Sequence, residues 1–202
     1  MLENDHKLLE KYVSDGIEAR KSIEVSAIIT VSEILFDRLK KGGKLITFGN
    51  GGSAADAQHF VAELSGRFMK ERKSFPAVAL TTNSSSLTAI GNDYDFSKVF
   101  SRQLEGICAK EDFVVGISTS GNSPNVIEGI RTARKIGAFT LALTGRDGGK
   151  VRNEADRCIR VNSDVTPLIQ EVHIAIIHMI PIRDLWRSQG EVTPIMAIAR
   201  DF

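Results

Sequence analysis

Three groups of polar side chains in this 202-residue sequence are spaced so that they could do chemistry. The first is His59 with Glu63, four residues later. On a helix this spacing places both side chains on one face, within one turn. A carboxylate there could act as a general base and an imidazole as a general acid. An ordinary ion pair on a solvated helix face is the alternative, and the spacing does not decide between the two.

The second group lies in an isoleucine-rich helical stretch, residues 167–180. Its members Gln170 and His178 are eight residues apart, about two turns, so they lie on adjoining parts of one side. A polar group among apolar neighbours needs a partner, and for His178 taken alone a buried structural histidine is favoured over a catalytic one. Together with His59 and Glu63, these side chains would form a nitrogen and oxygen ligand set that suits zinc. Spacing alone cannot show that the four converge.

The third group comprises two loops with the composition of anion sites. The first loop is Gly49-Asn50-Gly51-Gly52-Ser53. We expect Ser53 to cap a helix, with Asp56 in the capping-box position three residues later. The free N–H groups and the positive end of the dipole at that helix start would favour an anion.

The second loop carries four hydroxyls within six residues, Ser118, Thr119, Ser120 and Ser123. Ser123-Pro124 is a helix N-cap followed by proline at the first helical position. Ordinary capping explains one of these hydroxyls but not all four. Two such helix starts facing one crevice predict a phosphate site that needs no lysine.

Other phosphate motifs do not fit. The chain has no Gly-x-x-x-x-Gly-Lys-Ser/Thr sequence, which excludes a P-loop nucleoside triphosphatase. Gly49-x-Gly51-x-x-Ala54 matches a relaxed dinucleotide fingerprint, but the next strand ends in Thr81-Thr82 where that motif requires an acidic residue. We therefore expect no nucleotide or redox cofactor.

The elements that must position these residues alternate along the chain. Five short apolar runs, residues 44–48, 76–80, 113–117, 139–143 and 158–161, are separated largely by helical patterns. This order predicts an α/β fold with a five-stranded parallel sheet covered on both faces. Ligands bind at the carboxyl ends of such strands, where this sequence concentrates Gly, Ser and Thr.

The first 41 residues are expected to be helical, ending at Gly42-Gly43. Apolar residues recur there at helical spacing, at Ile28, Val31, Ile34, Leu35 and Leu39. Because this stripe is long for a helix on a small domain, part of it could face another subunit.

The composition is that of one globular domain, with 42% hydrophobic and 25% charged residues. The net charge of +1 argues against a general nucleic-acid surface, and no apolar run suggests a membrane span. The polar start does not resemble a signal peptide, and two cysteines, Cys108 and Cys158, make no disulfide framework. We expect a cytoplasmic protein with no nucleic-acid or membrane partner.

The two loops and Leu143-Thr144-Gly145-Arg146-Asp147-Gly148-Gly149 resemble the sugar isomerase (SIS) domain family. A narrower resemblance, to the phosphoheptose isomerase family, rests on His59-x-x-x-Glu63-Leu64-x-Gly66-Arg67, on Ala89-Ile90-Gly91-Asn92-Asp93 and on Ile169-Gln170-Glu171-x-His173 with His178. It implies a three-layer αβα fold over residues 44–180, N-terminal helices at 1–41 used in oligomerisation, and a homotetramer with sites at subunit interfaces. It also implies conversion of sedoheptulose 7-phosphate to D-glycero-D-manno-heptose 7-phosphate, for nucleotide-activated heptose and bacterial cell-surface polysaccharide such as lipopolysaccharide.

The resemblance also implies roles for particular residues. Glu63 would be the base and His178 the acid of an enediol proton transfer. Ser53, Ser118, Thr119, Ser120 and Ser123 would hold the phosphate. The sugar chain would contact Asn50, Asp93 and Gln170, beside Gly51 and Gly52. Some members bind one zinc ion per subunit through the positions of His59, Glu63, Gln170 and His178.

Two features depart from the family pattern. Leu168 stands where the motif often has arginine, so a charge contact is missing. Residues 181–202 no longer resemble the family. Pro181 costs ~3 kcal/mol in a helix interior, so the sequence leaves open whether the helix that carries His178 ends there.

Two other functions remain open at this point. One is a non-catalytic SIS adaptor of the kind that binds a replication initiator; that group lacks the Glu63 and His178 pairing. The other is an SIS enzyme that isomerises another sugar phosphate or cleaves an ether on an amino sugar.

Overall fold

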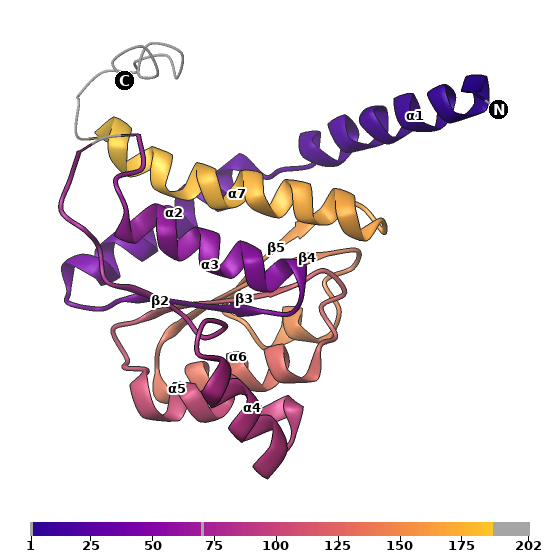
Figure 1. The fold of residues 1–202 in the computed structure, drawn as a ribbon. Helices are drawn as coiled ribbons and strands as arrows, with labels where there is room; N and C mark the ends of the chain where they lie inside the picture. Colours follow the sequence, from indigo (N-terminus) through magenta and orange to yellow (C-terminus); the bar gives the residue numbers. More distant parts are fainter. Residues whose placement is uncertain (1, 70, 188–202) are drawn as a thin grey trace.

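The computed structural model describes residues 2–69 and 71–187, which form one parallel sheet between two layers of helices (Figure 1). The strand order is β2-β1-β3-β4-β5. The bounds are β1 (Leu45–Gly49), β2 (Ala77–Ala79), β3 (Phe113–Ser118), β4 (Phe139–Gly145) and β5 (Arg157–Val161). The predicted three-layer α/β fold and all five predicted strands are therefore confirmed.

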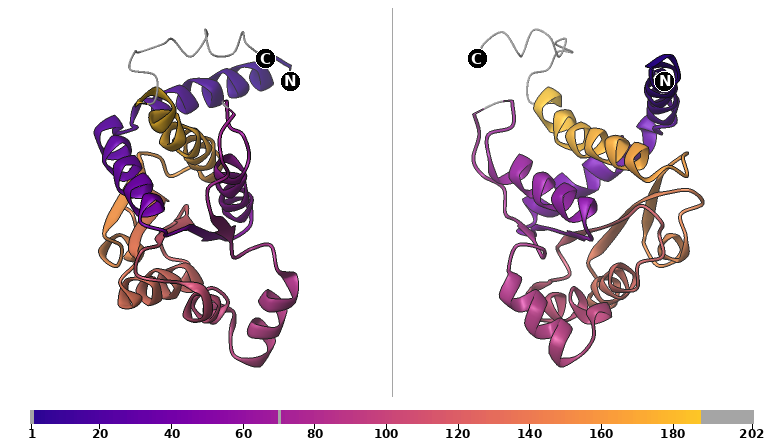
Figure 2. Two further views of the ribbon diagram at one scale, coloured as in Figure 1. Left: turned by 90° about the vertical axis from the view of Figure 1, so that its left-hand side faces the viewer. Right: turned by 45° about the vertical axis from the view of Figure 1, so that its right-hand side comes forward.

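The helices divide between the two faces of the sheet (Figures 1 and 2). One face carries α1 (Leu2–Lys21), α2 (Val25–Lys40), α3 (Gly52–Ser65) and α7 (Thr166–Arg187). The other carries α4 (Ser84–Asp93), α5 (Ser101–Ile107) and α6 (Pro124–Ile136), with the short 3-10 turns η1 (Phe96–Lys98) and η2 (Lys150–Asn153). No helix in the described residues is long and apolar enough to cross a membrane.

The N-terminal segment is helical, as expected, and it forms two helices. Residues 22–24 separate α1 from α2, and α1 extends beyond the body of the molecule (Figure 1). The end of α2 lies where the sequence predicts it, because the chain turns at Gly42 with φ +88°. The apolar stripe of α2 is buried against the sheet, whereas several apolar side chains of α1 are exposed.

Helix α7 continues through Pro181 to Arg187, so this proline does not end the helix that carries His178. Pro181 is buried, and α7 packs against α2 and α3. This packing offsets the lost backbone hydrogen bond. Residues 188–202 of the tail lie outside the described residues.

Leu168, the departure from the family motif, is buried in the core formed by α2, α3 and α7. Its Cδ2 would lie 3.6 Å from a Cβ placed on Gly16 of α1. Leu168 therefore places an apolar side chain near α1, where the family motif often has a charge.

The register of the sheet aligns the ends of its central strands. Gly49 of β1 lies opposite Ile117 of β3, and Ser118 of β3 lies opposite Thr144 of β4. The glycine-rich and hydroxyl-rich loops therefore leave the sheet from neighbouring strands at the same edge, as predicted.

Candidate functional site

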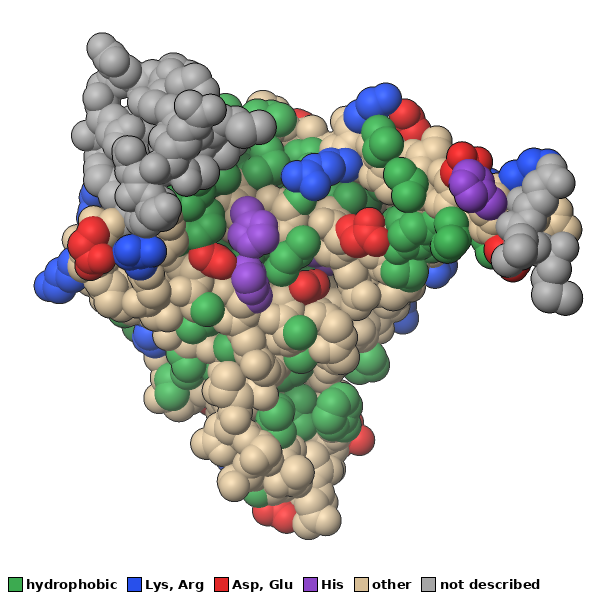
Figure 3. Space-filling model, turned by 45° about the horizontal axis from the view of Figure 1, so that its top comes forward, with side chains coloured by type: hydrophobic (Ala, Val, Ile, Leu, Met, Phe, Trp, Pro, Cys, Tyr) green, Lys and Arg blue, Asp and Glu red, His purple; other side chains and the backbone are tan. Residues whose placement is uncertain are grey.

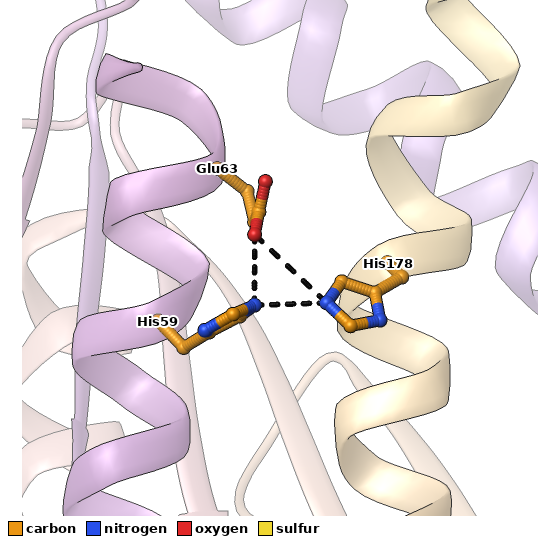
Figure 4. Close-up of side chains that lie close together, drawn as sticks. All are labelled: His59, Glu63 and His178. Atoms are coloured by element: carbon orange, nitrogen blue, oxygen red, sulfur yellow. Dashed lines mark hydrogen bonds and ion pairs between the residues drawn. The ribbon is translucent and has the colours of Figure 1, made fainter. Parts of the chain in front are cut away.

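His59 and Glu63 of α3 meet His178 of α7 (Figure 4). The Nε2 atom of His59 lies 2.8 Å from Glu63 Oε1 and 2.8 Å from His178 Nε2. The distance from His178 Nε2 to the same carboxylate oxygen is 3.9 Å. These three residues thus converge on one point, which their separation in sequence could not show.

The electrostatics favour a neutral His178. Burial lowers the pKa of its imidazole, and nearby His59 lowers it further. The Glu63 carboxylate acts in the opposite direction, while the positive charge of Arg20 on α1 adds to the lowering. A neutral imidazole keeps a lone pair that can accept a proton or bind a metal.

The three side chains form a possible metal-binding group, because their ligand atoms all lie within 4.8 Å of one another. Two imidazole nitrogens and a carboxylate oxygen are ligands that zinc accepts. The residues present therefore fit a metal ion.

Gln170 lies at the other end of the contact between α3 and α7. A Cβ placed on Gly52 would overlap its amide, at 2.9 Å from Cδ. Gln170 thus lies against the first residue of α3, and His178 lies beside His59 farther along both helices. The helices run side by side in the same direction, and they link the glycine-rich loop to the histidine pair.

The prediction that Ser53 caps α3 is wrong. The N-cap is Gly51, with φ +54°, and no side chain accepts a hydrogen bond there. Ser53 is the second helical residue and is buried. Asp56 makes no capping box; its Oδ2 is buried without a hydrogen-bond partner among the described residues, and burial raises its pKa to about 6.

The hydroxyl-rich loop, residues 118–123, has the predicted N-cap at Ser123 followed by Pro124. The Ser123 hydroxyl does not cap the helix but lies 3.0 Å from the hydroxyl of Ser118. The loop is supported from behind by residues 145–149, since Gly145 N–H donates to the Thr119 carbonyl at 3.0 Å. The hydroxyls of Ser118 and Ser123 therefore pair with each other, and neither caps α6.

Asn50 and Asp93, two of the expected sugar contacts, lie in different parts of the structure. Asn50 forms a pair of hydrogen bonds with Asn125, which the sequence analysis did not single out. Asp93 is at the end of α4, on the opposite side of the sheet from α3 and α7 (Figure 1). It accepts a hydrogen bond from neighbouring Asn92 at 2.9 Å, and it does not join the histidine cluster of its own chain.

A second residue that the sequence analysis missed is Phe68, whose ring stacks on His178 with centroids 6.3 Å apart. Phe68 follows Gly66-Arg67 of the quoted motif, which was the available signal. For Asn125 the signal was an amide at the second residue of a helix that begins in a proposed ligand loop.

The histidine pair is accessible from outside, as the space-filling view shows (Figure 3). The side chains of His59 and His178 are 42% and 41% exposed, against 18% for Glu63. Acidic and basic side chains surround the pair, and hydrophobic side chains lie along the projecting N-terminal helix. A small polar ligand can therefore reach the cluster.

Comparison with known proteins adds four findings. Residues 10–145 match the family described as SIS domain. The chain is 57% identical to the probable phosphoheptose isomerase of Thermoplasma acidophilum, over 85% of this chain and 94% of that one. The solved structure of phosphoheptose isomerase GmhA from Neisseria gonorrhoeae superimposes with a TM-score of 0.82 at 42% identity, covering 89% of this chain and 98% of that chain. That of a phosphoheptose isomerase from Francisella tularensis gives 0.83 at 34% identity, covering 91% and 98%.

Proposed function

The chain belongs to the SIS domain family and, within it, to the phosphoheptose isomerases, and from this premise we propose how its site acts. It is an aldose-ketose isomerase of sugar phosphates, which converts sedoheptulose 7-phosphate to D-glycero-D-manno-heptose 7-phosphate. The sequence alone left two other functions open, a non-catalytic adaptor and an enzyme for another sugar phosphate. Relatives named phosphoheptose isomerase support these two functions less well. The assignment of roles to residues is our proposal.

The observation that carries the proposal is the arrangement along α3. The glycine-rich loop lies at the start of α3, at Gly51 and Gly52. Glu63 and His178 lie at the other end of the site, next to His59. His59 is seven residues after Gly52, a rise of about 11 Å along a helix. An extended sugar phosphate with its phosphate at one end and its carbonyl at the other suits such a site.

Proton transfer uses the two ionisable groups at the far end. Glu63 removes a proton from C1 of the ketose and returns it to C2 of the enediol. Neutral His178 gives its ring N–H proton to the carbonyl oxygen at C2, and the same nitrogen then accepts the proton from the hydroxyl at C1. Each proton that leaves the substrate is thus returned, and the reaction is redox-neutral overall.

The substrate phosphate is held by hydroxyls and by helix starts. The proposed contacts are Ser53, Ser118, Thr119, Ser120 and Ser123. The starts of α3 and α6 add the positive ends of two helix dipoles. Asn50 and Gln170 bind the sugar hydroxyls between the two ends.

His59, Glu63 and His178 are proposed to hold one zinc ion. Gln170, the expected fourth ligand, lies against Gly52 in this chain, about two helical turns from His59, and does not join the other three. Zinc at this place would polarise the substrate carbonyl. Glu63 has two carboxylate oxygens, so it can bind the ion through one and still accept a proton at the other.

We also propose that the chain assembles as a cytoplasmic homotetramer. On α1, Leu8 and Val13 are 67% and 61% exposed, and Leu9, Tyr12 and Ile17 lie on the same helix. Such a patch on a projecting helix is typical of a protein interface. Asp93, distant from its own cluster, would then serve the site of another subunit. The product would supply heptose to nucleotide-activated precursors of cell-surface polysaccharide.

Turnover of sedoheptulose 7-phosphate by the purified protein, before and after treatment with a chelator and with added zinc, tests the function. We expect the aldose heptose phosphate to form, and turnover to fall with chelator and return with zinc. Absence of turnover under every metal condition would contradict the proposal. Turnover that chelator leaves unchanged would contradict only the role of zinc.

A further inference from the structure

Asn50 and Asn125 face each other with their side-chain amides. Asn50 Nδ2 donates to Asn125 Oδ1 at 2.9 Å, and Asn125 Nδ2 donates to Asn50 Oδ1 at 2.8 Å. The backbone N–H of Val126 also donates to Asn125 Oδ1, at 3.0 Å. That third bond determines which atom of Asn125 is oxygen, and the pair then determines the orientation of Asn50.

The two residues join loops that are 75 residues apart in the chain. Asn50 is the first residue after β1, and Asn125 is the second residue of α6, which follows the hydroxyl-rich loop. Strands β1 and β3 pair as far as Gly49 and Ile117. The amide pair therefore continues the link between the two chain segments beyond the end of the sheet.

The two amides differ in exposure. Asn125 is 2% exposed, so it is closed off from a ligand, whereas Asn50 is half-buried. Asn50 still has one N–H and one lone pair that the pair does not use. Asn50 can therefore bind a ligand while Asn125 holds it.

We propose that Asn125 is a positioning residue for the isomerase reaction, acting through Asn50. The reciprocal pair holds the glycine-rich loop against the hydroxyl-rich loop, and it aims the free N–H of Asn50 at the sugar. This inference rests on the proposed function, in which Asn50 contacts the sugar chain. Holding a contact in place before the substrate arrives lowers the cost of ordering it on binding.

Asn125→Asp tests the donor in this pair. At neutral pH the carboxylate offers only acceptors to Asn50 Oδ1, so one hydrogen bond is lost and two oxygens face each other. When protonated, the same side chain again offers one donor and one acceptor. Burial at this 2% exposed position raises the pKa of the new carboxyl above its usual value of about 3.9. Relative to wild type at the same pH, we therefore expect binding of sedoheptulose 7-phosphate to weaken by about tenfold near pH 8 and to recover toward about pH 5.5.

The measurements are KM, kcat and the calorimetric dissociation constants of sedoheptulose 7-phosphate and inorganic phosphate across that pH range. Asn153→Asp, at an exposed residue that ends η2, is the matched control for the added charge. Because Asn50 contacts the sugar, the variant should weaken sugar phosphate binding more than inorganic phosphate binding. A purely structural role predicts equal weakening of both, with no recovery at low pH.

Asn125→Leu is the second variant, in case the buried carboxylate of Asn125→Asp prevents folding. It removes both hydrogen bonds to Asn50 without adding a charge. We expect raised KM for the sugar phosphate at every pH, with no recovery. Binding and turnover like those of wild type in either variant, or a pH-independent loss in Asn125→Asp, would overturn the proposal. Should wild type bind the sugar phosphate without turning it over, the isomerase function fails, while the pH-dependent loss of binding still decides the role of Asn125.

Discussion

The amide of Gln170 occupies the space that a Cβ on Gly52 would fill. This contact places the start of α7 against the start of α3. The absence of a side chain at Gly52 is what lets the Gln170 amide approach the backbone of α3. The same two helices carry the histidine pair. A substitution at Gly52 therefore tests whether the packing of α3 against α7 matters for activity.

Gly52→Ala should displace Gln170 and reduce kcat/KM by about tenfold or more, because the new methyl group would lie 2.9 Å from Cδ of the amide. The matched control is Gly106→Ala in α5, where a Cβ would have nothing within 4 Å. That control should leave activity unchanged and stabilise the fold by about 0.5–1 kcal/mol. Steady-state kinetics and thermal unfolding of both variants decide; unaltered kinetics in Gly52→Ala would show that the amide is not needed there.

Glu63→Gln removes the proposed base while keeping the shape of the side chain. Turnover should fall by at least about a hundredfold, and inorganic phosphate should bind as in wild type, since the phosphate loops are untouched. Glu105→Gln, at an exposed ion pair with Arg102, is the control and should be fully active. Full activity in Glu63→Gln would eliminate the base assignment.

His59→Ala should weaken zinc binding by at least about tenfold, because one of the converging ligands is lost. His6→Ala, on exposed α1, is the control for loss of a histidine. The measurement is the amount of zinc bound per chain after dialysis against buffered zinc, with no substrate present. It reports on the metal site independently of activity. Equal zinc content in both variants would place the ion elsewhere.

His173 predicts a dependence of stability on pH. Its imidazole is fully buried, with Nε2 3.1 Å from the Thr144 carbonyl oxygen, and burial lowers its pKa to about 4 from 6.5. Between these values the unfolded chain binds a proton that the folded chain does not. Stability is therefore fully present above about pH 6.5 and falls by about 3 kcal/mol as the pH drops to about 4.

His173→Gln retains a side-chain N–H donor for the Thr144 carbonyl but has no titration in this range. Urea unfolding at several pH values should show a flatter profile for this variant than for wild type between about pH 6.5 and pH 4. Parallel profiles in the two proteins would mean that His173 does not carry the proton linkage.

Asp56 predicts the opposite effect. Because burial raises its pKa from 3.8 to about 6, the folded chain holds a proton that the unfolded chain releases as the pH rises through this range. The ionised carboxylate thus destabilises the fold above about pH 6, and Asp56→Asn should raise the melting temperature there but not below pH 4. A melting temperature that is unchanged or lower at neutral pH would contradict this account. Lower activity in a more stable variant would indicate that the buried carboxylate serves the site.

Local features were predictable because they depend on neighbours in the chain. The strands follow from short apolar runs, and the common face of His59 and Glu63 follows from helical spacing. Local patterns failed at Ser53, since the N-cap is a property of the backbone rather than of the nearest hydroxyl. The chain turns sharply at Gly49-Asn50-Gly51, where a Cβ on Gly49 would approach the Ile117 carbonyl oxygen to 2.9 Å, so β3 shapes that loop.

Local patterns in the sequence predicted the α/β class, the glycine-rich and hydroxyl-rich loops at one edge of the sheet, and a candidate acid and base. Only the tertiary structure decided that His178 meets His59 across 119 residues, that Gln170 lies against Gly52 and that Asn50 pairs with Asn125. It also kept α7 helical through Pro181, because a buried helix packed on two neighbours offsets the local penalty. The difference lies in how far along the chain each interaction acts. Periodicity and capping act over a few residues, whereas a site is assembled by packing that brings distant segments to the same place.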